Sequence, residues 1–179
     1  MRLVNVLFAV VVSGCGGMTA ESPLTVKLGG DRAQTTAVLK SHKFCHKEDG
    51  GPKPNPETYP RCDRPGAEWG ESWVIARFDQ DHLVELKRYE RFSDESRAVE
   101  RWNQLVGDRL KLHPNAPDAV AELQAKSLEP GTKSMKAWRL DTQTVVGVYL
   151  LTPTPPDNAS IVEAIVTLPK QASDIEVVQ

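Results

Sequence analysis

Residues 48–70 constrain the fold most, because they carry five prolines, at positions 52, 54, 56, 60 and 65, together with several glycines. Proline lacks the backbone N–H donor that helices and central strands need, so this stretch is predicted to be neither. We expect a long loop here, and long loops inside compact domains are usually functional or disordered. Regular structure is therefore expected in a short segment before the loop and in the longer part of the chain after it.

The N-terminus has the pattern of a secretory signal. Met1-Arg2 is followed by an apolar run from Leu3 to Val12 that only Asn5 interrupts. This run is shorter than the roughly 20 residues of a transmembrane helix, and a basic start, an apolar core and small residues before a cleavage site are typical of secretory signals. The tetrapeptide Val12-Ser13-Gly14-Cys15 resembles the lipobox of bacterial lipoproteins.

This resemblance implies cleavage before Cys15, with a diacylglyceryl group on its sulfur and usually a further acyl chain, such as palmitate, on its nitrogen. Each buried methylene contributes about 0.8 kcal/mol, so two or more chains anchor a protein firmly. Gly16 occupies the position where an Asp would imply retention in the inner membrane, which favours the outer membrane. The expected location is the bacterial cell envelope, with the domain facing the periplasm.

The charge balance excludes one class of partner. Without residues 1–14 the chain has 165 residues, with 21 basic side chains (22 less Arg2) against 24 acidic ones. This near-neutral balance argues against nucleic-acid binding, which requires a basic patch or stripe. The one local basic cluster, residues 87–91, is diluted by Glu85 and Glu90, and we interpret it as a solvated strand edge.

Two cysteines remain once Cys15 is assigned to lipid. Cys45 and Cys62 bracket the first part of the proline-rich loop, and in an exported chain they are predicted to form a disulfide. The alternative is a tetrahedral zinc site built from His42, Cys45, His46 and Cys62. This is the less favoured interpretation, because Cys45 and His46 are adjacent and the usual paired spacing of cysteines is missing. No cofactor is predicted.

Hydrophobic periodicity predicts the remaining elements. A first helix is expected over residues 32–43 with Asp31 as its N-cap, and a long amphipathic helix is expected with Ser93 as its N-cap. The apolar stripe of the long helix comprises Ala98, Val99, Trp102, Leu105, Val106 and Leu110. The other predicted elements are a hairpin over residues 72–92, a short helix over 118–127, a hairpin formed by 133–140 and 144–151, and a strand over 160–168.

Two registers are open for the first hairpin. We prefer the one that pairs Arg77 with Glu85 and Ala76 with Leu86 and places Phe78 near Val84, because it gathers the apolar side chains on one face. Trp73 then lies opposite Tyr89 as a cross-strand aromatic pair on the outer face. In the second hairpin, Trp138 is expected to face Val146. In the last strand, Glu163 is expected on the solvent face.

These elements indicate an α+β fold, an antiparallel sheet of about five strands with one long amphipathic helix packed on a face. The expected organisation is a signal peptide (1–14), a lipidated cysteine and tether (15–27), one domain (28–169) and a flexible tail (170–179). The order of helix, cysteine loop and strands, with Gly30-Asp31-Arg32 before the first helix, resembles small α+β lipoproteins of the outer-membrane assembly machinery and the related β-lactamase-inhibitor fold. The long helix between strands departs from their pattern, and no functional residue is carried over.

The sequence contains no recognisable catalytic signature, neither a G-x-S-x-G elbow, nor a phosphate-binding loop, nor H-E-x-x-H. We therefore predict a non-enzymatic role, in which a lipid-anchored domain contacts another envelope protein or the cell wall. Trp69, Trp73 and Tyr89 form the candidate contact surface, because aromatic residues beside a proline-rich loop suit an interface, whereas Trp102 and Trp138 are assigned to the core. The alternative is a periplasm-facing lipoprotein that binds a small molecule or a metal ion.

Overall fold

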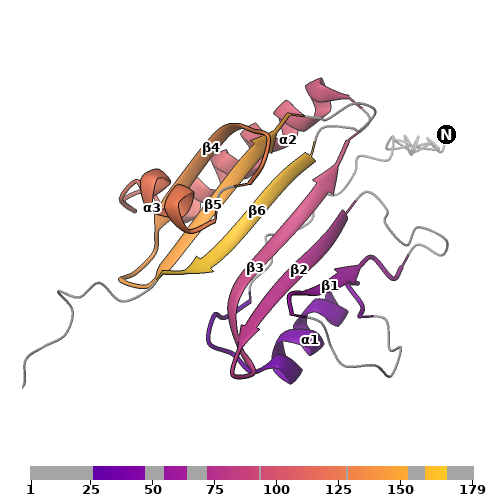
Figure 1. The fold of residues 1–179 in the computed structure, drawn as a ribbon. Helices are drawn as coiled ribbons and strands as arrows, with labels where there is room; N and C mark the ends of the chain where they lie inside the picture. Colours follow the sequence, from indigo (N-terminus) through magenta and orange to yellow (C-terminus); the bar gives the residue numbers. More distant parts are fainter. Residues whose placement is uncertain are drawn as a thin grey trace, which may run out of the picture.

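A computed structural model describes residues 26–46, 55–63, 72–92, 94–127, 129–152 and 160–168. Within these residues the chain forms one antiparallel sheet in the order β1-β2-β3-β6-β5-β4, with three helices (Figure 1). The helices are α1 (Arg32–Ser41), α2 (Glu95–Leu112) and α3 (Val120–Lys126). The strands are β1 (Glu57–Pro60), β2 (Ser72–Asp79), β3 (His82–Arg91), β4 (Thr132–Arg139), β5 (Thr144–Leu151) and β6 (Ser160–Thr167).

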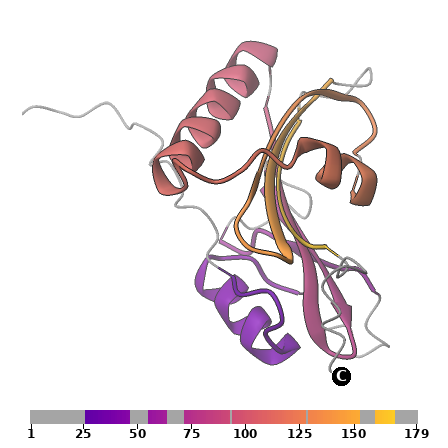
Figure 2. The same cartoon turned by 90° about the vertical axis from the view of Figure 1, so that its left-hand side faces the viewer.

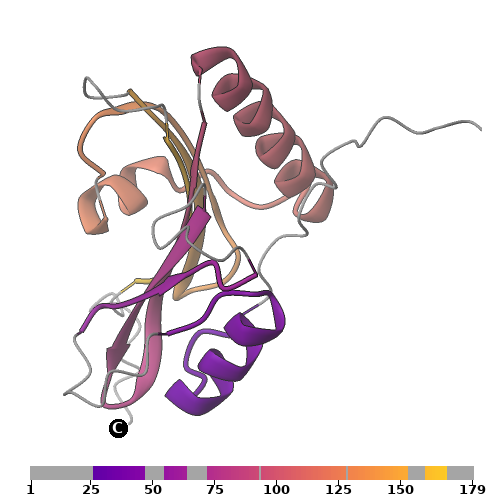
Figure 3. The same ribbon diagram turned by 90° about the vertical axis from the view of Figure 1, so that its right-hand side faces the viewer.

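The helices lie in two layers. Viewed along the sheet, α1 and α2 are on one side of it and α3 is on the other (Figures 2 and 3). The α+β class and the packing of the long helix on the sheet are as predicted. None of the described helices is both long and apolar enough to cross a bilayer.

The sheet has one strand more than the sequence predicted, because β1 lies inside the proline-rich stretch. Its four residues pair with β2, from Glu57 opposite Ala76 to Pro60 opposite Trp73. β1 is an edge strand, and Pro60 is its last residue, a position that tolerates proline because the missing N–H does not interrupt the ladder. Residues 57–60 of the stretch are therefore a strand, where a loop was expected.

The first hairpin adopts the preferred register over most of its length. Arg77 lies opposite Glu85, and Ala76 lies opposite Leu86. The tip differs from the prediction: the register shifts after Arg77, so that Phe78 meets Leu83 instead of Val84. A two-residue turn results, in which Gln80 and Asp81 have φ angles of 44° and 70°. Positive φ at both central residues matches the twist of the two strands.

The long helix begins one residue later than predicted, with Asp94 as its N-cap accepting from the N–H of Arg97 at 2.9 Å. Its inward stripe also differs, because Leu110 is 49% exposed whereas Arg109 is buried. Arg109 reaches the carboxylate of Glu163 on β6. The prediction that Glu163 faces solvent was therefore wrong, since a charge supplied by another element allows the carboxylate to be buried.

The apolar interior is divided between the two halves of the sheet. Over β1–β3, the core under α1 contains Leu39, Phe44, Tyr59, Val74, Ala76, Phe78, Leu83 and Leu86. Over β4–β6, α2 covers one face, where Trp138 faces Val146 as predicted, and α3 covers the other with Leu123. Gly147 lies directly beneath Leu123, because a Cβ at this glycine would be 2.0 Å from the Leu123 Cδ2 atom.

Candidate contact surface

One half of one sheet face has no described helix over it. Strand residues alternate between faces, so the side chains of β1–β3 that do not point to α1 lie on the face that carries α3. α3 packs mainly on β4 and β5, and the β1–β3 part of this face has no described helix over it (Figure 1). We call this area the helix-free half-face; its side chains are Thr58, Pro60, Trp73, Ile75, Arg77, Glu85, Lys87, Tyr89 and Arg91.

An aromatic pair stands at one end of the helix-free half-face. Trp73 and Tyr89 are directly opposite each other on β2 and β3, and their rings stack at 5.0 Å with an interplanar angle of 2°. This distance is close to the spacing of neighbouring strands, so the two rings stand side by side with their faces toward each other. The Arg91 guanidinium lies 5.3 Å from the Trp73 ring centroid. The predicted cross-strand pair is confirmed.

The Tyr89 ring is held in place by a polar network. Its hydroxyl donates to the Glu129 carboxylate at 3.3 Å, and Lys87 donates to the same carboxylate at 2.5 Å. Burial, followed by the negative charge of Glu129, raises the pKa of the Tyr89 hydroxyl well above its ordinary value. The Tyr89 hydroxyl therefore keeps its proton and donates it to Glu129, while the ring stacks on Trp73.

A second carboxylate, Glu85, ties the half-face to the connector after α3. It accepts from the Ser127 hydroxyl at 2.8 Å and pairs with Lys87 at 3.1 Å and with Arg77 at 3.2 Å. Burial alone would raise the pKa of Glu85, but the Ser127 hydrogen bond and the Lys87 charge outweigh it, and the pKa is lowered. A carboxylate with a lowered pKa is a weak base, so this cluster is suited to holding elements together.

The opposite face of β3 carries the other members of the basic run. Arg88 is 4% exposed and pairs with Glu90 at 2.5 Å. Arg101 from α2 donates to the two carboxylate oxygens of Glu90 at 2.8 and 2.9 Å. Burial alone would raise the pKa of Glu90, but the Arg101 hydrogen bonds and the Arg88 charge lower it. The interpretation of residues 87–91 as a solvated strand edge was wrong, because β3 is an interior strand paired on both sides.

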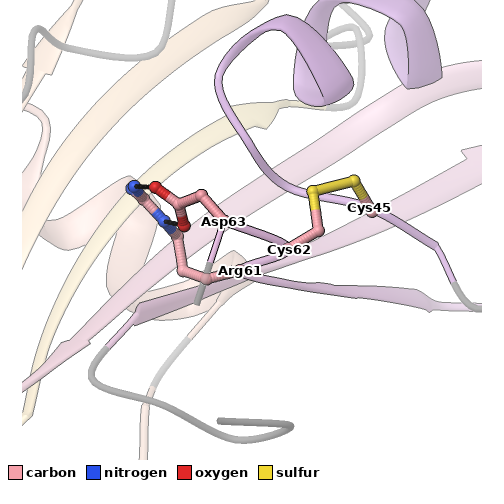
Figure 4. The surroundings of a disulfide bond; sticks show 4 residues. All are labelled: Cys45, Arg61, Cys62 and Asp63. Carbon is pink, nitrogen blue, oxygen red and sulfur yellow. Dashed lines mark hydrogen bonds and ion pairs between the residues drawn. A yellow bond between two sulfur atoms is a disulfide. The ribbon is translucent and has the colours of Figure 1, made fainter. Parts of the chain in front are cut away.

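A disulfide fastens the outer edge of β1. Cys45 and Cys62 are bonded, with their Cα atoms 5.6 Å apart, as predicted (Figure 4). Beside the bond, the Cys45 N–H donates to the Pro60 carbonyl and the Cys62 N–H donates to the Lys43 carbonyl. The chain after α1 therefore runs along β1 and is joined by the disulfide to the residues that follow this strand. Figure 4 also shows Arg61 and Asp63 paired next to the disulfide, at 2.6 and 2.9 Å.

The alternative zinc site loses both of its sulfur ligands to this disulfide. His46 instead contacts the Tyr59 ring edge-on, with the ring centroids 5.5 Å apart. Among the residues that the structure describes, no group of three or more His, Cys, Asp or Glu side chains could hold a metal ion.

The structure thus brings together two of the three predicted contact residues. Trp73 and Tyr89 are neighbours, whereas Trp69 and the lipidation residue Cys15 lie outside the described residues. Sequence reasoning missed Arg77, Lys87 and Arg91 as members of the same surface. Their positions could have been found from strand alternation, because residues 87, 89 and 91 must share a face if Tyr89 meets Trp73.

Comparison with known proteins adds no relative: the chain matches no protein-family model, no curated protein and no solved structure.

Proposed function

We propose that this chain is a lipid-anchored protein of the bacterial cell envelope, whose helix-free half-face contacts another envelope protein or the cell wall without catalysis. The observation that carries the proposal is the sequence Val12-Ser13-Gly14-Cys15 after a basic and apolar start. A Cys45–Cys62 disulfide is compatible with the oxidising environment of an envelope compartment.

The contact role is supported by the residue types on the half-face. Trp, Tyr and Arg are the residues most enriched at the energetic centres of protein interfaces. Trp73, Tyr89 and Arg91 lie together here on a sheet whose pairing holds them in position. A rigid anchor loses little conformational entropy when a partner binds, which favours this surface as the point of contact.

The lipid anchor is tested by expressing the full chain and its Cys15→Ser variant in a Gram-negative bacterium. Mass spectrometry of the N-terminal peptide should show acylated Cys15 at the start of the mature chain, and the variant should remain an unlipidated precursor. Recovery of normally processed, membrane-bound protein from the variant would refute the anchor.

The contact surface is tested by a photo-crosslinking amino acid placed at Ile75 in the native envelope. The matched control carries the same group at Asn103, an exposed position on α2. We expect a discrete crosslinked species from position 75 that is absent from position 103. Identical products from both positions would contradict the assignment of this face.

A further inference from the structure

The two aromatic rings of the helix-free half-face turn their edges outward. Trp73 and Tyr89 are parallel and 5.0 Å apart, so their faces meet across β2 and β3. Pro60 on β1 is the neighbour of Trp73 on its other side, and Val162 on β6 is the neighbour of Tyr89 on its other side. A sugar ring binds an aromatic side chain by lying against its face. With a residue of the next strand on each side, this pair is not suited to stack on the glycan of a cell wall.

The outward side of the aromatic pair attracts negative charge. An aromatic ring has a negative face and a positive edge, so two rings that show their edges favour an anion. The guanidinium of exposed Arg91 lies beside them, 5.3 Å from the Trp73 ring centroid. A guanidinium that stacks on a ring keeps its planar fork of N–H donors, which matches the two oxygens of a carboxylate.

The other charges of the half-face are already matched. Arg77 is paired with Glu85, and Lys87 is paired with both Glu85 and Glu129. The side chains of these two glutamates are each only 11% exposed, so their carboxylates turn inward to the network. Arg91 forms no ion pair within the described residues, and its positive charge is therefore the one that a partner can neutralise.

We propose that the partner of the helix-free half-face is a protein that places an Asp or Glu carboxylate on Arg91 and an apolar side chain on Ile75. Half-buried Ile75 lies two residues from Trp73 on the same face of β2, about 7 Å along the strand. The unpaired cation selects the carboxylate, and the outward ring edges favour a protein over a glycan. The proposal rests on the proposed contact function and narrows its partner to a protein with an acidic contact.

Carbodiimide coupling in the native envelope tests for the carboxylate. The reagent joins an amine to a carboxylate that touches it, forming an amide with loss of water. In the Arg91→Lys variant, the new amine should couple to an Asp or Glu of one protein, identified by mass spectrometry of the linked peptide. The parent chain gives the background from Lys87, and Asn103→Lys, at an exposed position on α2, is the matched control. Neither should give this product.

Charge reversal provides a second measurement. Arg91→Glu should reduce the yield of the photo-crosslink from position 75 several-fold, whereas Lys40→Glu, at an exposed position on α1, should leave the yield unchanged. An unchanged yield in Arg91→Glu overturns the proposal. An amide to a cell-wall peptide, or no amide at all, also overturns it, while a crosslink from position 75 would still support the contact function. The absence of any crosslink from position 75 in the parent chain refutes the contact function, and this proposal with it.

Discussion

The two halves of the sheet are stabilised by different means. β4–β6 lie between α2 and α3, so both of their faces are covered by helices with apolar side chains. Among the described helices, β1–β3 have α1 on one face and none on the other, and their edge is fastened by the Cys45–Cys62 disulfide. The comparison teaches that, within the described residues, the half of the sheet with the smaller helix cover is the half with the covalent crosslink.

Buried charges mark the border between the halves. Arg88 and Glu90 on β3 meet Arg101 from α2, and Glu163 on the neighbouring strand β6 meets Arg109. Paired charges of this kind contribute little net stability, because the cost of desolvation offsets their attraction. They connect α2 to β3 and β6, and the apolar contacts between α2 and the sheet supply most of the packing free energy.

The largest effect is expected from breaking the buried pair under α2. Arg109→Ala removes the cation that hydrogen-bonds the buried Glu163 carboxylate and leaves Arg88, opposite it on β3, as its nearest positive charge. Breaking a buried pair in this way should cost up to about 3–5 kcal/mol of unfolding free energy. Urea denaturation followed by circular dichroism measures the loss. The control is the double variant Arg109→Met with Glu163→Leu, which removes both charges and should recover most of the stability. A loss below about 1 kcal/mol for Arg109→Ala would mean that Arg88 or water replaces Arg109 as the partner of the carboxylate.

Removing the disulfide tests the other half. Replacing both Cys45 and Cys62 by Ser should reduce stability by about 3 kcal/mol, because the open loop gains conformational entropy in the unfolded chain. The effect should be local: amide hydrogen exchange should increase most in β1, while β5 keeps its protection. Equal increases in both strands would show that the two halves unfold as one unit, contrary to the comparison.

The sequence predicted those parts of the fold that a residue pattern within one element or one hairpin determines. The pairing of Trp73 with Tyr89 was predictable, because apolar alternation and the Arg77–Glu85 pair select one register. The tip of the same hairpin was not, since a bulge depends on turn geometry that Asp79-Gln80-Asp81 does not specify. β1 was missed because four residues between prolines carry too short a pattern to be distinguished from a loop.

Burial of charged residues was the main failure, and its reason is physical. Glu163 and Arg109 are 54 positions apart, and each looks solvent-exposed when its own element is considered alone. A carboxylate can be buried only if a partner from another element neutralises it, and the periodicity of one element contains no information about that partner. The candidate surface was predicted in part: Trp73 and Tyr89 were found as a pair, and alternation along the same two strands would also have placed Arg77 and Arg91 beside them.

A smaller loss of stability is expected from substitution of Gly147, where α3 packs closely on the sheet. Gly147→Ala places a methyl group against Leu123 and should cost about 1–3 kcal/mol, the usual range for an overpacked core. Leu123→Ala in the same chain should reduce the cost of the added methyl group, giving a favourable coupling in a double-mutant cycle. Gly107→Ala in α2 is the matched control: no atom lies within 4 Å of its added Cβ, so it should stabilise by about 0.5–1 kcal/mol.

The smallest change in the free energy of unfolding is expected when the pH is lowered, and it tests the buried charges at the border between the halves. The pKa of Glu85 and of Glu90 is lowered in the folded protein from the ordinary value of 4.5. A lowered folded-state pKa contributes stability that is complete above the unfolded value and disappears as pH falls toward the folded one. The unfolding free energy should therefore be constant near neutrality and decline below about pH 4.5. Glu90→Gln should flatten this decline, because its share of the proton linkage is gone, while Asn103→Gln, at an exposed position on α2, changes no titratable group and should leave the slope as it is. An equal slope in the parent chain and the Glu90→Gln variant would show that Glu90 is not held as an anion by Arg88 and Arg101.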